Sequence, residues 1–253
     1  MTAFEELALI YDQSINWSVR LNHELPFITN LIPGTKNRRI LDLACGSGRH
    51  AIALAKQGFS VIGLDSSSAM INAAQQHAQD HHVVVKFHKG DMRNAQSIVQ
   101  GPFDLILCFG NSLALLPSSQ ALQETLNGVH SLLGQKGMFV AQVLNFDEIR
   151  HSGFRFFPLK SGITSSGKEV VFARFFELIK TAETAQLIFT SFIKTSSKWQ
   201  TKTFAQTVLQ LTKPLLEVHI KNAGFRQFFA FADYNKNSFS LKESRNLVIV
   251  ALS

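Results

Sequence analysis

The chain has 253 residues, 45% of them hydrophobic, which predicts one large globular domain or a domain that carries a sizeable insertion. No apolar run reaches the roughly 18 residues that a membrane span requires, and the acidic, amphipathic start is unlike a signal peptide. Cys45 and Cys108 are the only cysteines, so we expect no disulfide framework and predict a cytoplasmic protein without a membrane partner.

The basic residues are concentrated in the second part of the chain. The formal net charge is +7, and residues 151–253 hold 14 Lys and Arg against 6 Asp and Glu, whereas residues 1–150 hold 11 against 12. These basic residues are scattered and form no cluster interleaved with aromatic residues. We therefore do not expect nucleic acid as a partner, and expect a solvated basic surface or one that favours an anionic acceptor.

Residues 4–32 are predicted to be helical, in two pieces. Between the pieces lies an aromatic and cationic group formed by Tyr11, Trp17 and Arg20. Trp17 can simply hold the helix against the core and Arg20 can simply be solvated, so composition leaves a structural and a ligand-binding role open.

Residues 39–65 have the pattern of a βαβ unit. A short apolar strand precedes Gly46 and Gly48, a helix begins at Arg49, and a second strand ends at Asp65, nineteen residues after Gly46. Gly46 can take the φ values of a tight turn, and Gly48 has no side chain to hold a ligand off the backbone. Asp65 can accept hydrogen bonds from two ribose hydroxyls. An ordinary βα turn is the alternative, but the agreement of all these features favours a nucleotide-binding loop.

The charge of Asp42 narrows the ligand class. This carboxylate lies at the end of the first strand and would repel a pyrophosphate, whereas it suits a cationic or amine-bearing ligand. The segment LDLACGSG resembles the first motif of class I S-adenosylmethionine-dependent methyltransferases, whose cofactor carries a sulfonium and an ammonium. The resemblance implies S-adenosylmethionine as the cofactor.

The N-terminal stretch carries a second resemblance. Tyr11-Asp12, Ile15, Trp17, Arg20, Glu24 and Phe27-Ile28 form a pattern similar to that of the glycine/sarcosine N-methyltransferase group. In that group an arginine twenty residues before the motif strand binds the cofactor carboxylate, and Arg20 lies twenty residues before Ile40. A guanidinium can pair with a carboxylate bidentately, so this role suits Arg20 chemically.

The chain after Asp65 continues the alternation of helix and strand. Serines 66–68 are expected to cap a helix that runs to about Gln79, and residues 83–87 form a third strand followed by GDMR at 90–93. In the methyltransferase family the Asp in this place binds the adenine amino group and the next residue packs on the ring, roles that Asp91 and Met92 match. A helix N-cap is the alternative for Asp91. The pair His81-His82 lacks a third ligand at a recognised spacing, so no metal site is predicted.

Two more strands end in motifs of the N-methyltransferase group. Residues 103–109 precede Gly110-Asn111-Ser112, and residues 138–144 precede Asn145-Phe146-Asp147. Ligands of parallel sheets bind beyond the carboxyl ends of the strands, where the prediction places Gly46, Asp65, Asp91, Asn111 and Asn145 together.

These elements predict an α/β fold: a doubly wound, mostly parallel seven-stranded Rossmann-like sheet with a small antiparallel β insertion after the fifth strand. We expect residues 1–33 to form an N-terminal helical lid, in which residues 4–20 order over the methionyl end when cofactor binds. Residues 34–152 and 212–253 then form the cofactor-binding domain. Residues 153–211, rich in Phe, Thr, Val and Ile with partial alternation, form the insertion on the acceptor side.

The predicted activity is methyl transfer to a small molecule, most simply to an amine nitrogen, by in-line displacement, which needs alignment more than acid–base groups. A small-molecule O-methyltransferase, an NAD-dependent oxidoreductase and a non-catalytic cofactor-binding scaffold are the alternatives, and self-association is left open. GDMR and the insertion also resemble amino-sugar N-methyltransferases, and Arg155 and Arg174 are candidates for holding an acceptor carboxylate. The predicted catalytic residues are Asn111, Asn145 and Tyr11. The predicted cofactor-binding residues are Arg20, Asp42, Ala44, Gly46, Gly48, Asp65, Ser66, Met70, Asp91, Met92, Phe109, Gly110 and Asn111.

Overall fold

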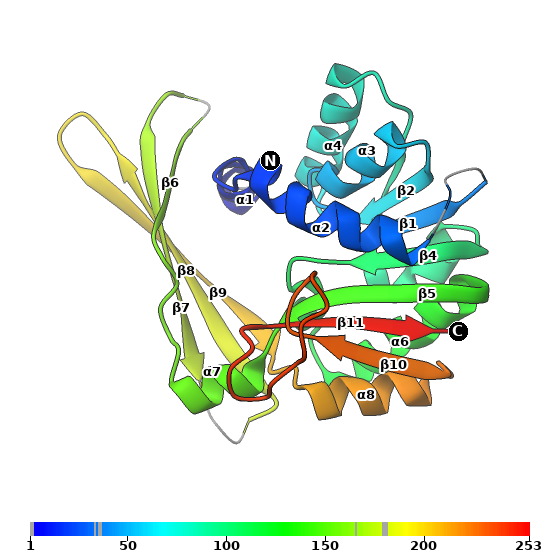
Figure 1. The fold of residues 1–253 in the computed structure, drawn as a ribbon. Helices are drawn as coiled ribbons and strands as arrows, with labels where there is room; N and C mark the ends of the chain where they lie inside the picture. Colours follow the sequence, from blue (N-terminus) through cyan, green and yellow to red (C-terminus); the bar gives the residue numbers. More distant parts are fainter. Residues whose placement is uncertain (1–2, 33, 35–36, 165, 179–181) are drawn as a thin grey trace.

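The computed structural model describes residues 3–32, 34, 37–164, 166–178 and 182–253, so the predictions for residues 1–2, 33, 35–36, 165 and 179–181 lie outside it. A seven-stranded sheet and a separate four-stranded antiparallel sheet stand side by side, with the first helix, α1, between them (Figure 1). The helices are α1 Ala3–Gln13, α2 Trp17–Leu31, α3 Arg49–Lys56, α4 Ser68–Asp80, α5 Ala95–Ile98, α6 Ser119–Leu132, α7 Phe146–Ser152 and α8 Lys213–Asn222, with 3₁₀ turns η1 Met92–Asn94 and η2 Ser112–Leu115.

The larger sheet has the strand order β10-β11-β5-β4-β1-β2-β3. Its strands are β1 Arg39–Leu43, β2 Ser60–Asp65, β3 Lys86–Lys89, β4 Phe103–Cys108, β5 Leu133–Leu144, β10 Gln227–Phe231 and β11 Asn246–Leu252. Strands β1 to β5 pair in parallel, while β11 runs antiparallel to both β5 and β10. This is the predicted mostly parallel sheet, with β3 displaced a few residues towards the C-terminus. The strand order reverses between β1 and β4, which opens a crevice at their carboxyl ends.

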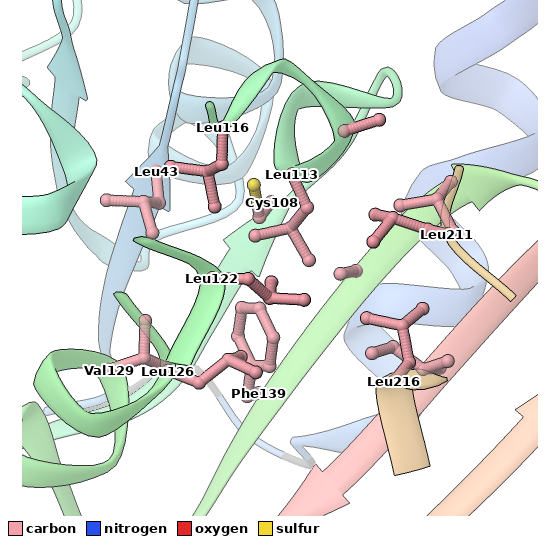
Figure 2. Close-up of a cluster of buried hydrophobic side chains, with 14 of the residues drawn as sticks. Leu43, Cys108, Leu113, Leu116, Leu122, Leu126, Val129, Phe139, Leu211 and Leu216 are labelled. Atoms are coloured by element: carbon pink, nitrogen blue, oxygen red, sulfur yellow. The ribbon is translucent and has the colours of Figure 1, made fainter. Parts of the chain in front are cut away.

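Both faces of this sheet are covered by helices, which explains the nearly continuous apolar runs of its central strands. On one face, Phe27 and Ile28 of α2 and Leu54 of α3 pack against β1, β4 and β5. On the other, α6 and α8 contribute Leu122, Leu126, Val129 and Leu216, which belong to one buried cluster with Phe139 of β5 (Figure 2). Cys108 lies in the second cluster, and Cys45 is also buried; both are free thiols. The two packed layers hold the strand ends in fixed positions.

The insertion forms the second sheet, β6 Lys160–Ile163, β7 Glu169–Leu178, β8 Thr184–Lys194 and β9 Trp199–Leu209. All its pairings are antiparallel. Val170 and Phe172 of β7 pack with Ile10 of α1, so the N-terminal segment contacts this sheet directly. Figure 1 shows α1 in the space between the antiparallel sheet and helices α3 and α4. No helix of the described residues is long and apolar enough to cross a membrane.

Candidate functional site

The loop after β1 is shaped by two glycines and fixed by Asp65. Gly46 and Gly48 have φ values of 54° and 77°, a region that side chains disfavour. The Gly46 amide donates to Asp65 Oδ2 at 2.8 Å, and the Ser67 amide donates to Asp65 Oδ1 at 2.8 Å. A carboxylate has about four acceptor positions, so Asp65 retains lone pairs for a ligand.

Gly48 is needed for a reason different from the predicted one. A Cβ on Gly48 would lie 2.8 Å from Phe87 Cζ and 2.9 Å from Ala74 Cβ, and Gly48 does not line the cavity described below. Its missing side chain therefore allows the start of α3 to pack against β3 and α4. Gly46 has the positive φ predicted for a tight turn, and nothing lies within 4 Å of a Cβ built there, so this face of the loop is open.

A cavity of about 490 Å³ lies at the carboxyl ends of the strands and extends to the antiparallel sheet. It is lined by the N-terminal segment, the glycine loop, the ends of β2, β4 and β5, and strands β7 to β9. The predicted site residues that line it are Tyr11, Arg20, Asp42, Ala44, Gly46, Asp65, Met70, Phe109, Gly110 and Asn111. The structure thus brings together residues that are up to 100 positions apart in the sequence.

Two carboxylates of this cavity, Asp42 and Asp65, lie at the ends of parallel strands, and a third, Asp12, belongs to α1. Asp42 is buried and accepts a hydrogen bond from the Ala51 amide at 3.2 Å. Burial raises the pKa of Asp42 to about 6, although the nearby His50 opposes the shift. Burial also raises the pKa of Asp65, against hydrogen bonds from backbone amides. These carboxyl groups are consequently held ready for a cationic or hydrogen-bond-donating ligand.

The N-terminal segment closes one side of the cavity. Ser47 Oγ of the glycine loop donates to Asp12 Oδ2 at 2.7 Å, and Trp17 Nε1 donates to the Asp12 carbonyl at 3.0 Å. The Tyr11 ring meets Phe172 and Phe189 of the antiparallel sheet edge-on, with centroids 5.8 and 5.6 Å apart. This segment therefore contacts both the glycine loop and the insertion.

The opposite side of the cavity is aromatic and cationic. The Arg174 guanidinium lies over the rings of Tyr11 and Phe157, at 4.7 and 4.6 Å from their centroids. Its Nε is buried and has no hydrogen-bond partner among the described residues. Arg155 lies outside the cavity lining and donates from Nε to the Phe176 carbonyl at 3.1 Å. Of the two arginines considered from the sequence, only Arg174 faces the cavity.

Asn145 does not line the cavity, which corrects its predicted role in orienting an acceptor. Its side chain is fully buried, and Nδ2 donates to the carbonyls of Leu241 and Ser244 at 3.0 and 2.8 Å. Its Oδ1 accepts from the Asp147 amide and caps α7. With these polar atoms engaged inside the protein, Asn145 fixes the loop that precedes β11.

Three further predicted residues lie outside the cavity lining: Ser66, Asp91 and Met92. Asp91 caps η1, and its carboxylate pairs with the Arg93 guanidinium at 2.7 Å, which lowers its pKa. Met92 packs at the edge of the larger core cluster. The predicted adenine contacts of Asp91 and Met92 therefore remain a prediction, while the N-cap alternative for Asp91 is observed.

The sequence reasoning missed a buried ionic group beside Arg20. Arg20 Nε donates to Glu24 Oε1 at 2.9 Å, and Glu24 Oε2 is in contact with Nε2 of His50, which lines the cavity. A glutamate between the apolar residues of a core-facing helix face, four positions after Arg20, was the available signal.

The chain matches the model of a methyltransferase domain family over residues 34–200. It belongs to this family. Glycine/sarcosine N-methyltransferase from Aphanothece halophytica is 31% identical over 145 residues, which are 57% of this chain and 55% of that protein. Such aligned regions span only about half the length of the glycine/sarcosine N-methyltransferases that the chain matches.

Solved structures agree with the fold. An S-adenosylmethionine-dependent methyltransferase from Clostridium acetobutylicum ATCC 824 superposes with a TM-score of 0.76 at 16% identity, covering 99% of both chains. An amino pentose methyltransferase from Micromonospora echinaspora, solved with S-adenosylmethionine bound, has a TM-score of 0.70 at 17% identity and covers 100% of this chain and 98% of that one. Together with the family match, these findings confirm the predicted methyltransferase family and Rossmann-like fold.

The residues of the cavity fit the family's cofactor. The ribose diol of this cofactor needs hydrogen-bond acceptors, which Asp65 can supply. Its ammonium group needs an anion such as Asp42, and its carboxylate needs a cation such as Arg20, and all three residues line the cavity. The open face of Gly46 leaves room for a ligand against the backbone. No group of three or more His, Cys, Asp or Glu side chains suited to a metal occurs in the part of the chain that the structure describes.

Proposed function

We propose that the protein transfers a methyl group from S-adenosylmethionine to an amine nitrogen of a small molecule. The observation that carries this proposal is the division of the cavity into a carboxylate side at the strand ends and an aromatic, cationic side on the insertion. The glycine/sarcosine N-methyltransferases and a sugar N-methyltransferase among the similar proteins support nitrogen as the acceptor atom.

The strand-end side is suited to hold the cofactor, which when bound supplies a methyl group on a sulfonium, an electrophile with a good leaving group. Asp65 accepts hydrogen bonds from the ribose hydroxyls, Asp42 attracts the ammonium, and Arg20 pairs with the carboxylate. Gly46 and Gly110, both at positive φ, let the ligand approach the backbone. The packed sheet fixes these groups in advance, which is how the chain contributes alignment.

The insertion side is suited to hold an acceptor that carries an anionic group. Arg174 offers a guanidinium whose Nε lacks a partner among the described residues, and the rings of Tyr11 and Phe157 exclude water around it. Asn111 uses its Oδ1 to accept from the Leu144 amide at 2.9 Å, which leaves its amide nitrogen for the acceptor. An amine with a carboxylate or similar anion thus matches this side best.

Nitrogen is favoured over oxygen because, among the described residues, the insertion side of the cavity offers no evident base. Burial raises the pKa of Tyr11, although Arg174 opposes the shift, so the phenol stays protonated near neutral pH. His50 is engaged with Glu24. A neutral amine brings its own lone pair after losing a proton to solvent, whereas a hydroxyl acceptor requires a base or a metal.

A screen of small amines and polyols for release of S-adenosylhomocysteine tests the proposal. We expect turnover with an amine that carries an anionic group, and a product in which NMR places the new methyl on nitrogen. A product methylated on oxygen or carbon would refute the N-methyl assignment and leave the methyltransferase class intact. Binding of the cofactor without turnover across the whole panel would favour the scaffold alternative.

A further inference from the structure

Glu24 joins two elements on the cofactor side of the cavity. It lies on α2 and is only 4% exposed. One carboxylate oxygen accepts from Arg20 Nε, and the other contacts His50 Nε2 on α3. A single buried carboxylate therefore connects the arginine that faces the cavity with the helix that follows the glycine loop.

The terminal nitrogens of Arg20 point towards the end of β4. A carbon placed at the Cβ position of Gly110 would lie 3.6 Å from Arg20 Nη2 and 3.9 Å from Nη1. The guanidinium also stacks over Trp17, 4.9 Å from the ring centroid. Glu24 and Trp17 thus restrain one edge and one face of the guanidinium and leave its terminal nitrogens facing the cavity.

The His50 side chain is held in place by two aromatic neighbours. Its ring meets Trp17 and Phe109 edge-on, with centroids 5.8 and 5.4 Å apart. Burial alone would raise the pKa of Glu24, but hydrogen bonds and charges from His50 and Arg20 lower it. The carboxylate is therefore ionised at neutral pH and can restrain Arg20 electrostatically.

We infer that Glu24 is a positioning residue: held by His50, it aims the Arg20 guanidinium at the cofactor's carboxylate. This inference rests on the proposed function, since it takes Arg20 as the partner of that carboxylate. A freely rotating arginine loses considerable side-chain entropy when it binds a ligand, and restraint before binding removes that cost from the affinity.

A ligand pair separates positioning from a general structural role. S-Adenosylhomocysteine carries the carboxylate, whereas adenosine shares its nucleoside part and lacks the amino acid. If Glu24 acts through Arg20, Glu24→Gln weakens S-adenosylhomocysteine by about tenfold and leaves adenosine affinity within about twofold of wild type. If Glu24 only supports the packing of α2 against α3, the substitution weakens both ligands together.

Calorimetry on the full chain with both ligands is the experiment. Glu217→Gln, the same chemical change on the exposed face of α8, is the matched control and should bind both ligands as wild type does. In an Arg20→Ala background, Glu24→Gln should cause no further loss for S-adenosylhomocysteine, because the group it positions is gone. Glu24→Asp, which keeps the charge but cannot span both partners, should give an intermediate loss.

Several outcomes overturn the inference. They are equal losses for both ligands, an unchanged affinity of Glu24→Gln for S-adenosylhomocysteine, or losses that simply add in the double variant. If neither Glu24 variant shows a cooperative unfolding transition, neither is folded. Glu24 then has a structural role, which also overturns the inference. If wild type does not bind S-adenosylhomocysteine, the proposed function fails too. If wild type binds S-adenosylhomocysteine, and Arg20→Ala weakens this binding while Glu24→Gln does not, the positioning role alone is refuted.

Discussion

The two sides of the cavity are built by different means. On the strand-end side, polar groups lie at the ends of buried parallel strands, and burial raises the pKa values of Asp42 and Asp65. On the insertion side, a guanidinium lies among aromatic rings on a sheet with few fully buried side chains. From this comparison we expect substitutions on the strand-end side to disturb the fold more than substitutions of the half-buried residues on the insertion side.

The same difference explains what could be predicted from the sequence. The glycine loop, Asp65 and the strand ends follow one another at fixed spacings, because a βαβ unit places them at one edge of the sheet. Antiparallel strands impose no such order, so Arg174 and Arg155 looked equivalent until the fold placed only Arg174 in the cavity. The role predicted for Asn145 was wrong for another reason: a position at a strand end does not reveal whether the side chain faces the ligand or a neighbouring loop.

The cofactor side should carry a measurable cost in stability, and Asp42→Asn tests this most strongly. The folded protein retains a proton on Asp42 up to about pH 6, whereas the unfolded chain releases it near 3.8. Stability of the unliganded protein therefore falls as pH rises through this range, by up to about 3 kcal/mol from this group. Asp42→Asn should be more stable than wild type at pH 7, with a smaller difference at pH 4.5, in urea unfolding. A variant less stable than wild type at pH 7 would contradict this.

The acceptor side should depend on Arg174 without affecting the cofactor. Arg174→Ala removes hydrogen bonds to a charged group, worth about 1.5–3 kcal/mol, and should lower kcat/KM for the acceptor accordingly. Affinity for S-adenosylhomocysteine should stay unchanged in calorimetry. Arg155→Ala, outside the cavity lining, is the control and should retain wild-type kinetics. Equal losses in the two variants would show that Arg174 has no special role.

Asp65→Ala should produce the opposite pattern. The substitution removes the acceptor of the ribose hydroxyls and one fixed point of the glycine loop, since the Gly46 amide donates to this carboxylate. Affinity for S-adenosylhomocysteine should fall roughly tenfold or more, in line with about 1–3 kcal/mol for a buried hydrogen-bonding group. An unchanged affinity of the variant for S-adenosylhomocysteine would show that Asp65 does not bind the cofactor.

Asn145→Ala should affect stability and spare both sides of the cavity. The variant leaves the carbonyls of Leu241 and Ser244 without their donor, which costs about 1 kcal/mol or somewhat more. Thermal unfolding should therefore shift downward, while the acceptor kinetics of the folded enzyme remain close to wild type. A large loss of kcat/KM with unchanged stability would restore the role predicted from the sequence.

The central claim, that the strand-end side binds S-adenosylmethionine and not a dinucleotide, is tested most directly by calorimetry of the wild-type protein with S-adenosylhomocysteine and with NAD. The account predicts a one-site isotherm with S-adenosylhomocysteine and no measurable heat with NAD, because a pyrophosphate would meet the buried carboxylate of Asp42. Tight binding of NAD with no response to S-adenosylhomocysteine would contradict it.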